Sequence, residues 1–323
     1  MRAVIAEAHG GPEVLRLAEH DAPEPGPGQV LVDVAAAGIN YMDIYQREGR
    51  PPYRGDVPFV PGGEGAGTVA AVGPDVDGPR KGDRVAWSGV PGSYAEQVVI
   101  PAGRAVLVPD GIDLQTAAAV MLQGMTAHYL VTDTYPVAAG DPVVVHAAAG
   151  GVGLLLTQMV KMRGGVVIGT TSTTQKAELA RGAGADHVVG YAGLGAAVSE
   201  VTGGEGAAVV YDGVGQATFD ESLAALRRRG YMVLYGGASG PVPPLDPQRL
   251  NVGGSLFLTR PTLADYVTTR EELLARADDL FRWVGQGKLA VRIGGRYPLD
   301  EAARAQEDLA ARRTTGKLIL LPG

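Results

Sequence analysis

The sequence predicts an α/β protein in which a mostly antiparallel β region precedes a doubly wound, parallel sheet of six strands. Between about residues 140 and 260, apolar runs alternate with segments of helical length, as in a parallel sheet covered by helices on both faces. The first 110 residues instead form short runs broken by Gly, Pro or Asp, which favours antiparallel β structure. These two patterns set the fold class.

Composition and charge exclude several classes of protein. The chain has 323 residues, 46% of them apolar and 20% charged, which is a globular composition. It has no cysteine, which excludes disulfides, thiolate nucleophiles and cysteine-ligated zinc. The formal net charge of −7 argues against nucleic acid as the main partner. Neither a signal peptide nor an apolar run of about 18 residues is seen, so we expect a cytoplasmic protein with no membrane span.

The strands of the β region are predicted from residues that alternate between the two faces of a strand. Val30, Val32 and Val34 share one face of a run that begins after the breaker Pro23–Gly28. Similar short runs predict strands at Gly67–Val72, Arg84–Trp87, Glu96–Ile100 and Ala105–Val108.

The parallel sheet is predicted from six apolar runs, at Val143–Val145, Val166–Ile168, His187–Val189, Ala208–Tyr211, Met232–Tyr235 and Leu256–Thr259. The clearest crossover helix spans Val152–Val160, with apolar residues at helical spacing and Gly164 as its terminator. The basic run Arg227–Arg229 is predicted to end another helix, because cations stabilise a helix C-terminus. We expect these arginines to be solvated and not to bind nucleic acid.

The C-terminal part is predicted to contain two helices and a strand. Thr269–Glu272 has the capping-box pattern that begins a helix, whose buried stripe continues to Val284. A shorter helix is expected at Asp300–Ala311 and a strand at Lys317–Leu320.

A glycine-rich turn after the first parallel strand predicts dinucleotide binding. The strand Pro142–His146 runs into Ala147–Gly153 and then into the clearest helix. Glycine lets the backbone approach a pyrophosphate, and the helix N-terminus supplies free N–H groups. Gly150 and Gly153 keep the GxGxxG spacing, whereas Ala148 stands at its first glycine. A purely structural turn is the alternative, but the strand before and the helix after favour binding.

The residues after the second parallel strand indicate which dinucleotide binds. An NAD site normally has Asp or Glu there. In this chain Gly169–Lys176 supplies hydroxyl groups and one lysine, and the first carboxylate is Glu178, inside the next helix. Ser172 and Lys176 therefore suit the 2′-phosphate of NADPH, which a carboxylate would repel. The alternative is that Lys176 is an ordinary solvated lysine at a helix start.

Motifs along the whole chain carry a family resemblance. They are Gly10–Val14, Gly38–Asn40 followed by Asp43 and Tyr45, Pro61–Gly67, Gly82–Val85, the His146–Gly153 turn, Tyr211–Gly215 and Thr259–Pro261. Together they resemble the quinone oxidoreductases, the zeta-crystallin-like branch of the medium-chain dehydrogenase/reductase superfamily. The resemblance implies a Rossmann domain for NADPH at residues 122–262, inserted into a GroES-like, mostly-β catalytic domain of residues 1–121 and 263–323.

The resemblance also implies where a substrate and a second copy of the chain would bind. The active-site cleft is expected between the two domains, where such pockets usually form. Family members commonly form homodimers through the sixth strand of the nucleotide domain, which is Ser255–Arg260 in this chain. An apolar edge strand of this kind is rarely left bare.

The same resemblance implies the residues of the site. Asn40 and Tyr45 would line the nicotinamide end, where Tyr45 could give a proton or a hydrogen bond to the developing oxyanion. The alternatives are a turn role for Asn40 and a packed aromatic role for Tyr45. Cofactor contacts are implied at Thr126, Ala149, Gly150, Gly151, Val152, Ser172, Lys176, Tyr191, Tyr235, Gly236, Gly237 and Leu258. Relatives often carry Ser and Asn at the positions of Gly213 and Gly237, so those two residues are expected to make backbone contacts alone.

A metal site is not expected. The zinc-containing branch of the superfamily needs cysteine and histidine ligands, and in Gly62–Glu64 a glycine stands where that branch has its histidine. The histidines, which show no ligand spacing, are expected at the surface or satisfied in the core; they are His9, His20, His128, His146 and His187. Glu64 is expected either as a charge near the cleft or as a buried structural carboxylate.

The expected chemistry follows from the lack of metal ligands. Reduction of a simple carbonyl would lack a Lewis acid, whereas quinones and enones spread the added charge over a conjugated system. The resemblance therefore implies an NADPH:quinone oxidoreductase of the EC 1.6.5 type, acting on a small apolar quinone or enone. The alternatives are an NADPH-dependent enone or enoyl-thioester reductase and a non-catalytic, crystallin-like NADPH-binding protein.

Overall fold

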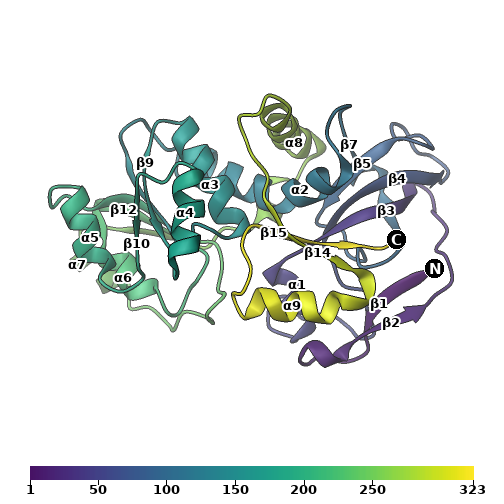
Figure 1. Cartoon of the computed structure of the whole chain (residues 1–323), viewed down its shortest axis with the longest axis horizontal. Coiled ribbons are helices and arrows are strands. Elements are labelled where there is room, and N and C mark those ends of the chain that lie inside the picture. Colours follow the sequence, from purple (N-terminus) through teal and green to yellow (C-terminus); the bar gives the residue numbers. More distant parts are fainter. The chain divides into compact units, whose positions relative to one another are not determined.

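A computed structural model describes the whole chain, residues 1–323, as two compact units. One unit combines Met1–Met125 with Val267–Gly323, and the other is the continuous segment Thr126–Tyr266. The first unit is thus assembled from both ends of the chain. In Figure 1 the yellow C-terminal strand β15 lies beside β3 from the N-terminal part, and the two strands pair antiparallel.

The Thr126–Tyr266 unit is built on a six-stranded sheet whose strands are all parallel. Their order is β10-β9-β8-β11-β12-β13, the 3-2-1-4-5-6 order of a Rossmann fold. The strands are β8 (Pro142–Val145), β9 (Val166–Thr170), β10 (His187–Val189), β11 (Ala207–Asp212), β12 (Leu226–Leu234) and β13 (Phe257–Thr259). The predicted doubly wound sheet is confirmed.

Helices connect these strands (Figure 1). They are α3 (Gly151–Met162), α4 (Thr174–Gly182), α5 (Leu194–Val201), α6 (Phe219–Ala224) and α7 (Gln248–Val252). The stripe predicted for α3 is buried, with Leu155, Leu156 and Met159 at most 3% exposed. The helix ends where Gly164 adopts a φ of +83°, a left-handed conformation that favours glycine.

The core of this unit lies on the central strands. Val144, Ile168, Val210 and Met232 are each 0% exposed and pack in one cluster. Fully burying such a side chain contributes about 1.5–3 kcal/mol, which explains why the central strands are continuous apolar runs. Strand β13 pairs only with β12 and is therefore an edge of the sheet.

The prediction that Arg227–Arg229 ends a helix was wrong. Helix α6 ends at Ala224, and the three arginines lie in the first half of β12. Leu226 enters the core of the sheet, so the chain has already become a strand when the basic run begins. The interaction of charges with a helix terminus is weak. Burial of Leu226 contributes more free energy and therefore determines where the helix ends and the strand begins.

The other unit contains a mixed sheet and a hairpin. The sheet order is β14-β15-β3-β4-β5-β7, with β6 also paired to β3, and only β14 and β15 run parallel. Its strands are β3 (Gln29–Ile39), β4 (Glu64–Val72), β5 (Arg84–Ser88), β6 (Gln97–Pro101), β7 (Val106–Leu107), β14 (Ile293–Pro298) and β15 (Lys317–Leu321), and the hairpin is β1 (Arg2–Ala6) with β2 (Leu15–Glu19). The mostly-β expectation is confirmed.

The helices of this unit are α1 (Tyr41–Arg47), α8 (Arg270–Gly285) and α9 (Ala302–Ala310), while α2 (Leu114–Tyr129) continues into the other unit. The capping box predicted before α8 is present, because Thr269 Oγ1 accepts from Glu272 N at 3.2 Å and Glu272 accepts from Thr269 N at 3.3 Å. Helix α1 and strand β14 were not predicted. No helix is both long and apolar enough to cross a membrane.

Candidate functional site

The glycine-rich turn joins β8 to α3 and leaves the start of this helix without a side-chain cap. Ala147 adopts a φ of +50°, and Gly150 N donates to Ala147 O at 2.8 Å. Gly150 then serves as the N-cap of α3, and no side chain caps this helix end. The first N–H groups of α3 therefore stay available to an anion.

Gly153 is the position in this turn where a side chain does not fit. A Cβ there would lie 2.3 Å from Ala147 O and 2.8 Å from Ala148 Cα. Ala148 itself is buried and donates its N–H to Thr170 O at 3.1 Å, so the turn is tied to β9. Alanine is thus accommodated at the first GxGxxG position, and the close approach depends on Gly153. The sequence prediction that this turn binds a pyrophosphate stays a prediction, to which the close backbone approach at Gly153 adds support.

The candidate 2′-phosphate residues lie at the start of α4. Thr173 caps this helix, its Oγ1 accepting from Lys176 N at 3.3 Å. Ser172 is exposed just before the cap, and Lys176 is half-buried in the first turn. Glu178, the first carboxylate after β9, is exposed within the helix. The structure thus brings Ser172 and Lys176 together at a helix N-terminus that follows β9.

Two of the predicted cofactor tyrosines pack against the sheet ends. The Tyr191 ring stacks on the His146 ring with centroids 5.9 Å apart and planes at 7°. The Tyr235 ring covers Gly213, where a Cβ would lie 2.8 Å from the ring. Gly213 therefore makes room for Tyr235, and burial holds the pKa of that phenol well above its usual value.

His146 is a satisfied core residue. Its Nδ1 lies 2.9 Å from Thr170 Oγ1 and its Nε2 lies 2.9 Å from Ser222 Oγ. Ser222 also donates to Asp212 at 3.1 Å. Burial lowers the pKa of His146, with Asp212 acting in the opposite direction. The side chains of His146, Ser222 and Asp212 are each 0% exposed. These three residues therefore have no access to a substrate and support the sheet.

The remaining predicted cofactor residues of this unit are spread more widely. Ala149 is 3% exposed within the turn, and Thr126 is 8% exposed in α2. Leu258 is 37% exposed on the edge strand β13. Gly236 lies close to the loop after β11, since a Cβ there would be 2.5 Å from Gly213 O. Gly237 follows in the same half-buried loop.

Asn40 and Tyr45 belong to the other unit, both at helix α1. Asn40 is the N-cap of α1 and forms a capping box with Asp43, whose Oδ2 accepts from Asn40 N at 2.8 Å. Tyr45 is half-buried beside Tyr53 and Tyr41, with ring centroids 5.4 and 6.2 Å away, and the Arg50 guanidinium lies 5.4 Å from its ring centroid. The turn role and the packed aromatic role foreseen as alternatives are both present.

A buried polar cluster surrounds Asn40 and was not predicted from the sequence. Asn40 Nδ2 donates to Glu64 Oε1 at 2.7 Å, and Asn40 Oδ1 accepts from Lys317 Nζ at 2.8 Å. Lys317 Nζ also pairs with Glu64 Oε1. Glu64 is 0% and Lys317 1% exposed. Glu64 is thus the buried structural carboxylate that was one of its two expected roles.

Two further residues complete this cluster. Gln123 Nε2 donates to Asn40 Oδ1 at 3.4 Å, and Leu122 N donates to Glu64 Oε2 at 2.7 Å. The glycine of Gly38–Asn40 makes room for the cluster, because a Cβ at Gly38 would lie 2.3 Å from Glu64 Oε1. Lys317 was missed because a lysine at the start of an apolar run normally reads as a solvated strand end.

Asp43 borders the cluster and titrates near neutral pH. Burial raises its pKa to about 6, against hydrogen bonds from Asn40 N and Tyr94 and the charge of Lys317. Tyr94 Oη donates to Asp43 Oδ2 at 2.9 Å, and burial raises the pKa of Tyr94 well above its usual value. Asp43 was part of a sequence motif, but only the structure shows that its carboxyl is buried.

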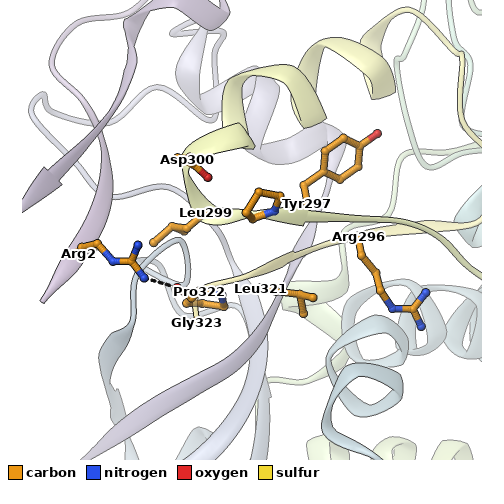
Figure 2. A pocket seen from close by; sticks show the side chains of 9 residues that line it. Arg2, Arg296, Tyr297, Leu299, Asp300, Leu321, Pro322 and Gly323 are labelled. Atoms are coloured by element: carbon orange, nitrogen blue, oxygen red, sulfur yellow. Dashed lines mark hydrogen bonds between the residues drawn. The ribbon is translucent and has the colours of Figure 1, made fainter.

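No group of three or more acidic or histidine side chains in the structure is arranged to hold a metal ion. A surface hollow of about 380 Å³ lies at the ends of β14 and β15 (Figure 2). Its lining residues are Arg2, Arg296, Tyr297, Pro298, Leu299, Asp300, Leu321, Pro322 and Gly323. Arg2 spans part of it by donating to Pro322 O at 2.9 Å. The hollow contains none of the predicted site residues.

Two protein-family models match the chain. The model "Alcohol dehydrogenase GroES-like domain" matches residues 26–110, and "Zinc-binding dehydrogenase" matches residues 151–277. A GroES-like part combined with a Rossmann sheet and its glycine-rich turn defines a medium-chain dehydrogenase/reductase. The fold and the turn thus establish the class before any single relative is considered.

Individual relatives narrow this class. A quinone oxidoreductase of Pseudomonas aeruginosa is 46% identical over 318 residues, 98% of each chain. The crystal structure of Escherichia coli quinone oxidoreductase complexed with NADPH is 40% identical, covers all of both chains and has a TM-score of 0.97. A 2-haloacrylate reductase of Burkholderia sp. is 40% identical over 328 residues, 99% of this chain and 98% of the relative. The chain belongs to the quinone oxidoreductase family and is an oxidoreductase.

Proposed function

We propose that the chain is an NADPH:quinone oxidoreductase of the EC 1.6.5 type, which transfers a hydride from NADPH to a quinone or a related conjugated carbonyl. The observation that carries this proposal is the uncapped turn Ala147–Gly153 at the first crossover of a Rossmann sheet. Family membership supports it, because relatives along the full chain are quinone oxidoreductases and one is solved with NADPH.

In this proposal the Thr126–Tyr266 unit binds the cofactor. The N–H groups of Gly150, Gly151 and Val152 would bind the pyrophosphate at the start of α3. Ser172 and Lys176 would bind the 2′-phosphate, where hydroxyl and ammonium groups meet an anion with no carboxylate before Glu178. Further contacts are proposed from Thr126, Ala149, Tyr191, Tyr235, Gly236, Gly237 and Leu258. Bound NADPH supplies the hydride.

The other unit would supply the groups at the reacting end. Asn40 would donate a hydrogen bond from its carboxamide, and Tyr45 would give a hydrogen bond or a proton to the oxygen that gains charge. The Tyr41–Tyr45–Tyr53 group with Arg50 is an aromatic surface on which a planar, apolar acceptor would pack. Positioning and hydrogen bonding suffice for a conjugated acceptor, because its charge is delocalised after hydride addition.

The test is NADPH oxidation by the purified protein with ortho-quinones, para-quinones, simple enones and enoyl-thioesters at equal concentrations. We expect kcat/KM for at least one quinone to exceed that for every enone or thioester. Turnover of enones or thioesters alone would contradict the quinone assignment.

A second candidate is an NADPH-dependent reductase of conjugated acids, enones or enoyl-thioesters. The observation that favours it is the 2-haloacrylate reductase relative, which is 40% identical along nearly the whole chain. The substrate in the name of this relative is a conjugated carboxylate, so the same fold serves activated carbon–carbon double bonds. Adding 2-chloroacrylate to the substrate panel separates the two candidates.

We also propose that the chain forms a homodimer through β13 and acts in the cytoplasm. Phe257 and Leu258 on this edge strand are 49% and 37% exposed, and the backbone of an exposed strand edge is free to pair with a second copy. Cell fractionation would test the location, and light scattering would test the dimer.

A further inference from the structure

Three strand ends converge on one buried carboxamide. Asn40 follows β3, Glu64 begins β4 and Lys317 begins β15. The Asn40 side chain lies between the two charges, with Nδ2 on Glu64 at 2.7 Å and Oδ1 on Lys317 Nζ at 2.8 Å. Asn40 is 5% exposed, so water does not screen these contacts strongly.

The chemistry of the two neighbours permits one orientation of the carboxamide. An ammonium group only donates hydrogen bonds, and an ionised carboxylate only accepts them. A 180° flip of the Asn40 amide would place Nδ2 against Lys317 and Oδ1 against Glu64, so both hydrogen bonds would be lost. The ion pair therefore determines which end of the amide faces each way.

The Asn40 side chain has one hydrogen-bond donor that is not used within the protein. An amide oxygen accepts two hydrogen bonds and an amide nitrogen donates two. Oδ1 accepts from Lys317 and from Gln123, and Nδ2 donates once, to Glu64. The second N–H of Nδ2 has no acceptor within the protein. Asn40 can thus offer a ligand a hydrogen-bond donor and nothing else.

We propose that Glu64 and Lys317 are positioning residues, which fix the Asn40 carboxamide so that its remaining Nδ2–H donates to an oxygen of the bound cofactor or acceptor. This inference rests on the proposed function, in which Asn40 lies at the reacting end. It adds Glu64 and Lys317 as residues that act without touching a reactant. It also assigns Asn40 the role of a hydrogen-bond donor to a carbonyl or hydroxyl oxygen, never that of an acceptor.

Fold stability alone does not require this ion pair. Buried ion pairs are often no better than apolar residues of the same volume, because desolvation offsets the attraction between the charges. The Glu64–Lys317 pair contacts the Asn40 amide and determines its orientation. Gly38 makes room for the Glu64 carboxylate beside it. Orientation of Asn40 is a role that an apolar pair could not perform.

A spectroscopic test is available because the chain has two asparagines, Asn40 and Asn251. Selective ¹⁵N-asparagine labelling then gives two side-chain NH₂ signals, and the exposed Asn251 is an internal control. We expect one Asn40 side-chain proton to lie downfield in the wild type and to move upfield in Glu64→Gln, with Asn251 unchanged. Unchanged Asn40 signals in both Glu64→Gln and Lys317→Met would overturn the orientation argument, whatever the enzyme reduces.

A kinetic double-mutant cycle tests the positioning role. We expect Asn40→Ala and Glu64→Gln each to lower kcat for quinone reduction about tenfold or more at saturating NADPH, and the double variant to be within about twofold of Asn40→Ala. If the fold losses in kcat of the two single variants multiply in the double variant, the proposal is overturned. Lys161→Met is the control, because it breaks a half-exposed lysine–carboxylate pair with Asp186 in the other unit, and it should leave kcat unchanged.

A neutral double variant separates positioning from stability. Glu64→Gln with Lys317→Met removes both buried charges at similar volume, so its unfolding temperature should lie above that of Lys317→Met. Its kcat should remain low, because nothing then fixes the amide; recovery of kcat together with stability would contradict positioning. If the wild type reduces no quinone, the proposed function fails by itself, and the same cycle on the NADPH dissociation constant decides the inference.

Discussion

Gly153 is the residue of the glycine-rich turn at which an added side chain would make the closest contact. For Gly153→Ala, the added Cβ would lie 2.3 Å from Ala147 O, so the turn must shift. We expect a loss of about 1–3 kcal/mol in the free energy of unfolding and an NADPH dissociation constant raised about tenfold, measured by urea unfolding and fluorescence titration.

The matched control for this substitution is Gly182→Ala in α4, where an added Cβ meets nothing within 4 Å. That variant should bind NADPH normally and be more stable by up to about 1 kcal/mol, because alanine is the better helix former. Wild-type NADPH affinity in Gly153→Ala would contradict the account of the turn.

Asp43 gives the stability of the protein a pH dependence of unusual sign. Its pKa is about 6 when folded and close to 3.8 when unfolded, so between these pH values the folded state binds the proton more tightly. Stability from this group therefore falls as pH rises from 4 to 6, by about 3 kcal/mol in total.

Asp43→Asn removes this dependence. An amide oxygen can still accept from Asn40 N and Tyr94 Oη, which both donate to Asp43 Oδ2. The difference in unfolding free energy, variant minus wild type, should therefore increase from pH 4.5 to pH 7. Urea unfolding at both pH values measures it, and a constant difference would show that Asp43 does not titrate in this range.

The first turn of α4 is the element that sets cofactor choice in this account. Lys176 lies there after Ser172, beyond the end of β9. Lys176→Ala should lower the ratio of kcat/KM for NADPH over NADH about tenfold, because a charge-assisted contact to the 2′-phosphate is lost while NADH is unaffected. Lys288→Ala, at an exposed site of the other unit, should keep the ratio. An unchanged ratio in Lys176→Ala would identify it as a solvated helix-start lysine.

The edge strand β13 is the element expected to pair with a second copy. Phe257 is half exposed and stacks on Tyr231 with centroids 4.5 Å apart. Phe257→Lys places a charge on this edge and should convert a dimer to a monomer in light scattering, since inward charges block strand pairing. Met162→Lys, also at an exposed apolar residue of this unit, should leave the mass unchanged. A monomeric wild type would refute the dimer.

Elements with strong periodicity were predictable, and short or mixed ones were not. The α3 stripe, the α8 capping box and the six parallel strands follow from local pattern, because burial on one face dictates it. Helix α1 has only 7 residues, and its N-cap Asn40 directly follows the last residue of strand β3. Strand β12 begins at Leu226, just before the basic run, because Leu226 belongs to the core, and tertiary contacts alone decide this.

The candidate site was predictable in its backbone part and not in its buried charges. Gly150 and Gly153 predict a phosphate-binding turn, because glycine lets the backbone adopt conformations and close approaches that other residues do not. Lys317 lies far from Glu64 in sequence, and the two meet because β15 and β4 both pair with β3. No spacing rule relates residues that a sheet brings together from opposite ends of the chain.

At the scale of the whole molecule, the proposed site residues are divided between two units with different sheets. The proposed cofactor residues lie in Thr126–Tyr266, whereas Asn40, Tyr45 and the Glu64–Lys317 pair lie in the unit formed by both chain ends. In the proposal, helix N-termini that follow strands of the parallel sheet bind the phosphates, whereas the mixed sheet holds Asn40, Glu64 and Lys317 at strand ends. Neither unit contains all the proposed functions by itself.

We propose above all that this chain transfers a hydride from NADPH to a quinone. The most direct measurement is the initial rate of NADPH oxidation by the purified protein with a para-quinone, with NADH in place of NADPH as the control. We expect turnover that saturates in both substrates and a higher kcat/KM with NADPH than with NADH. Tight NADPH binding without oxidation by any quinone would contradict it.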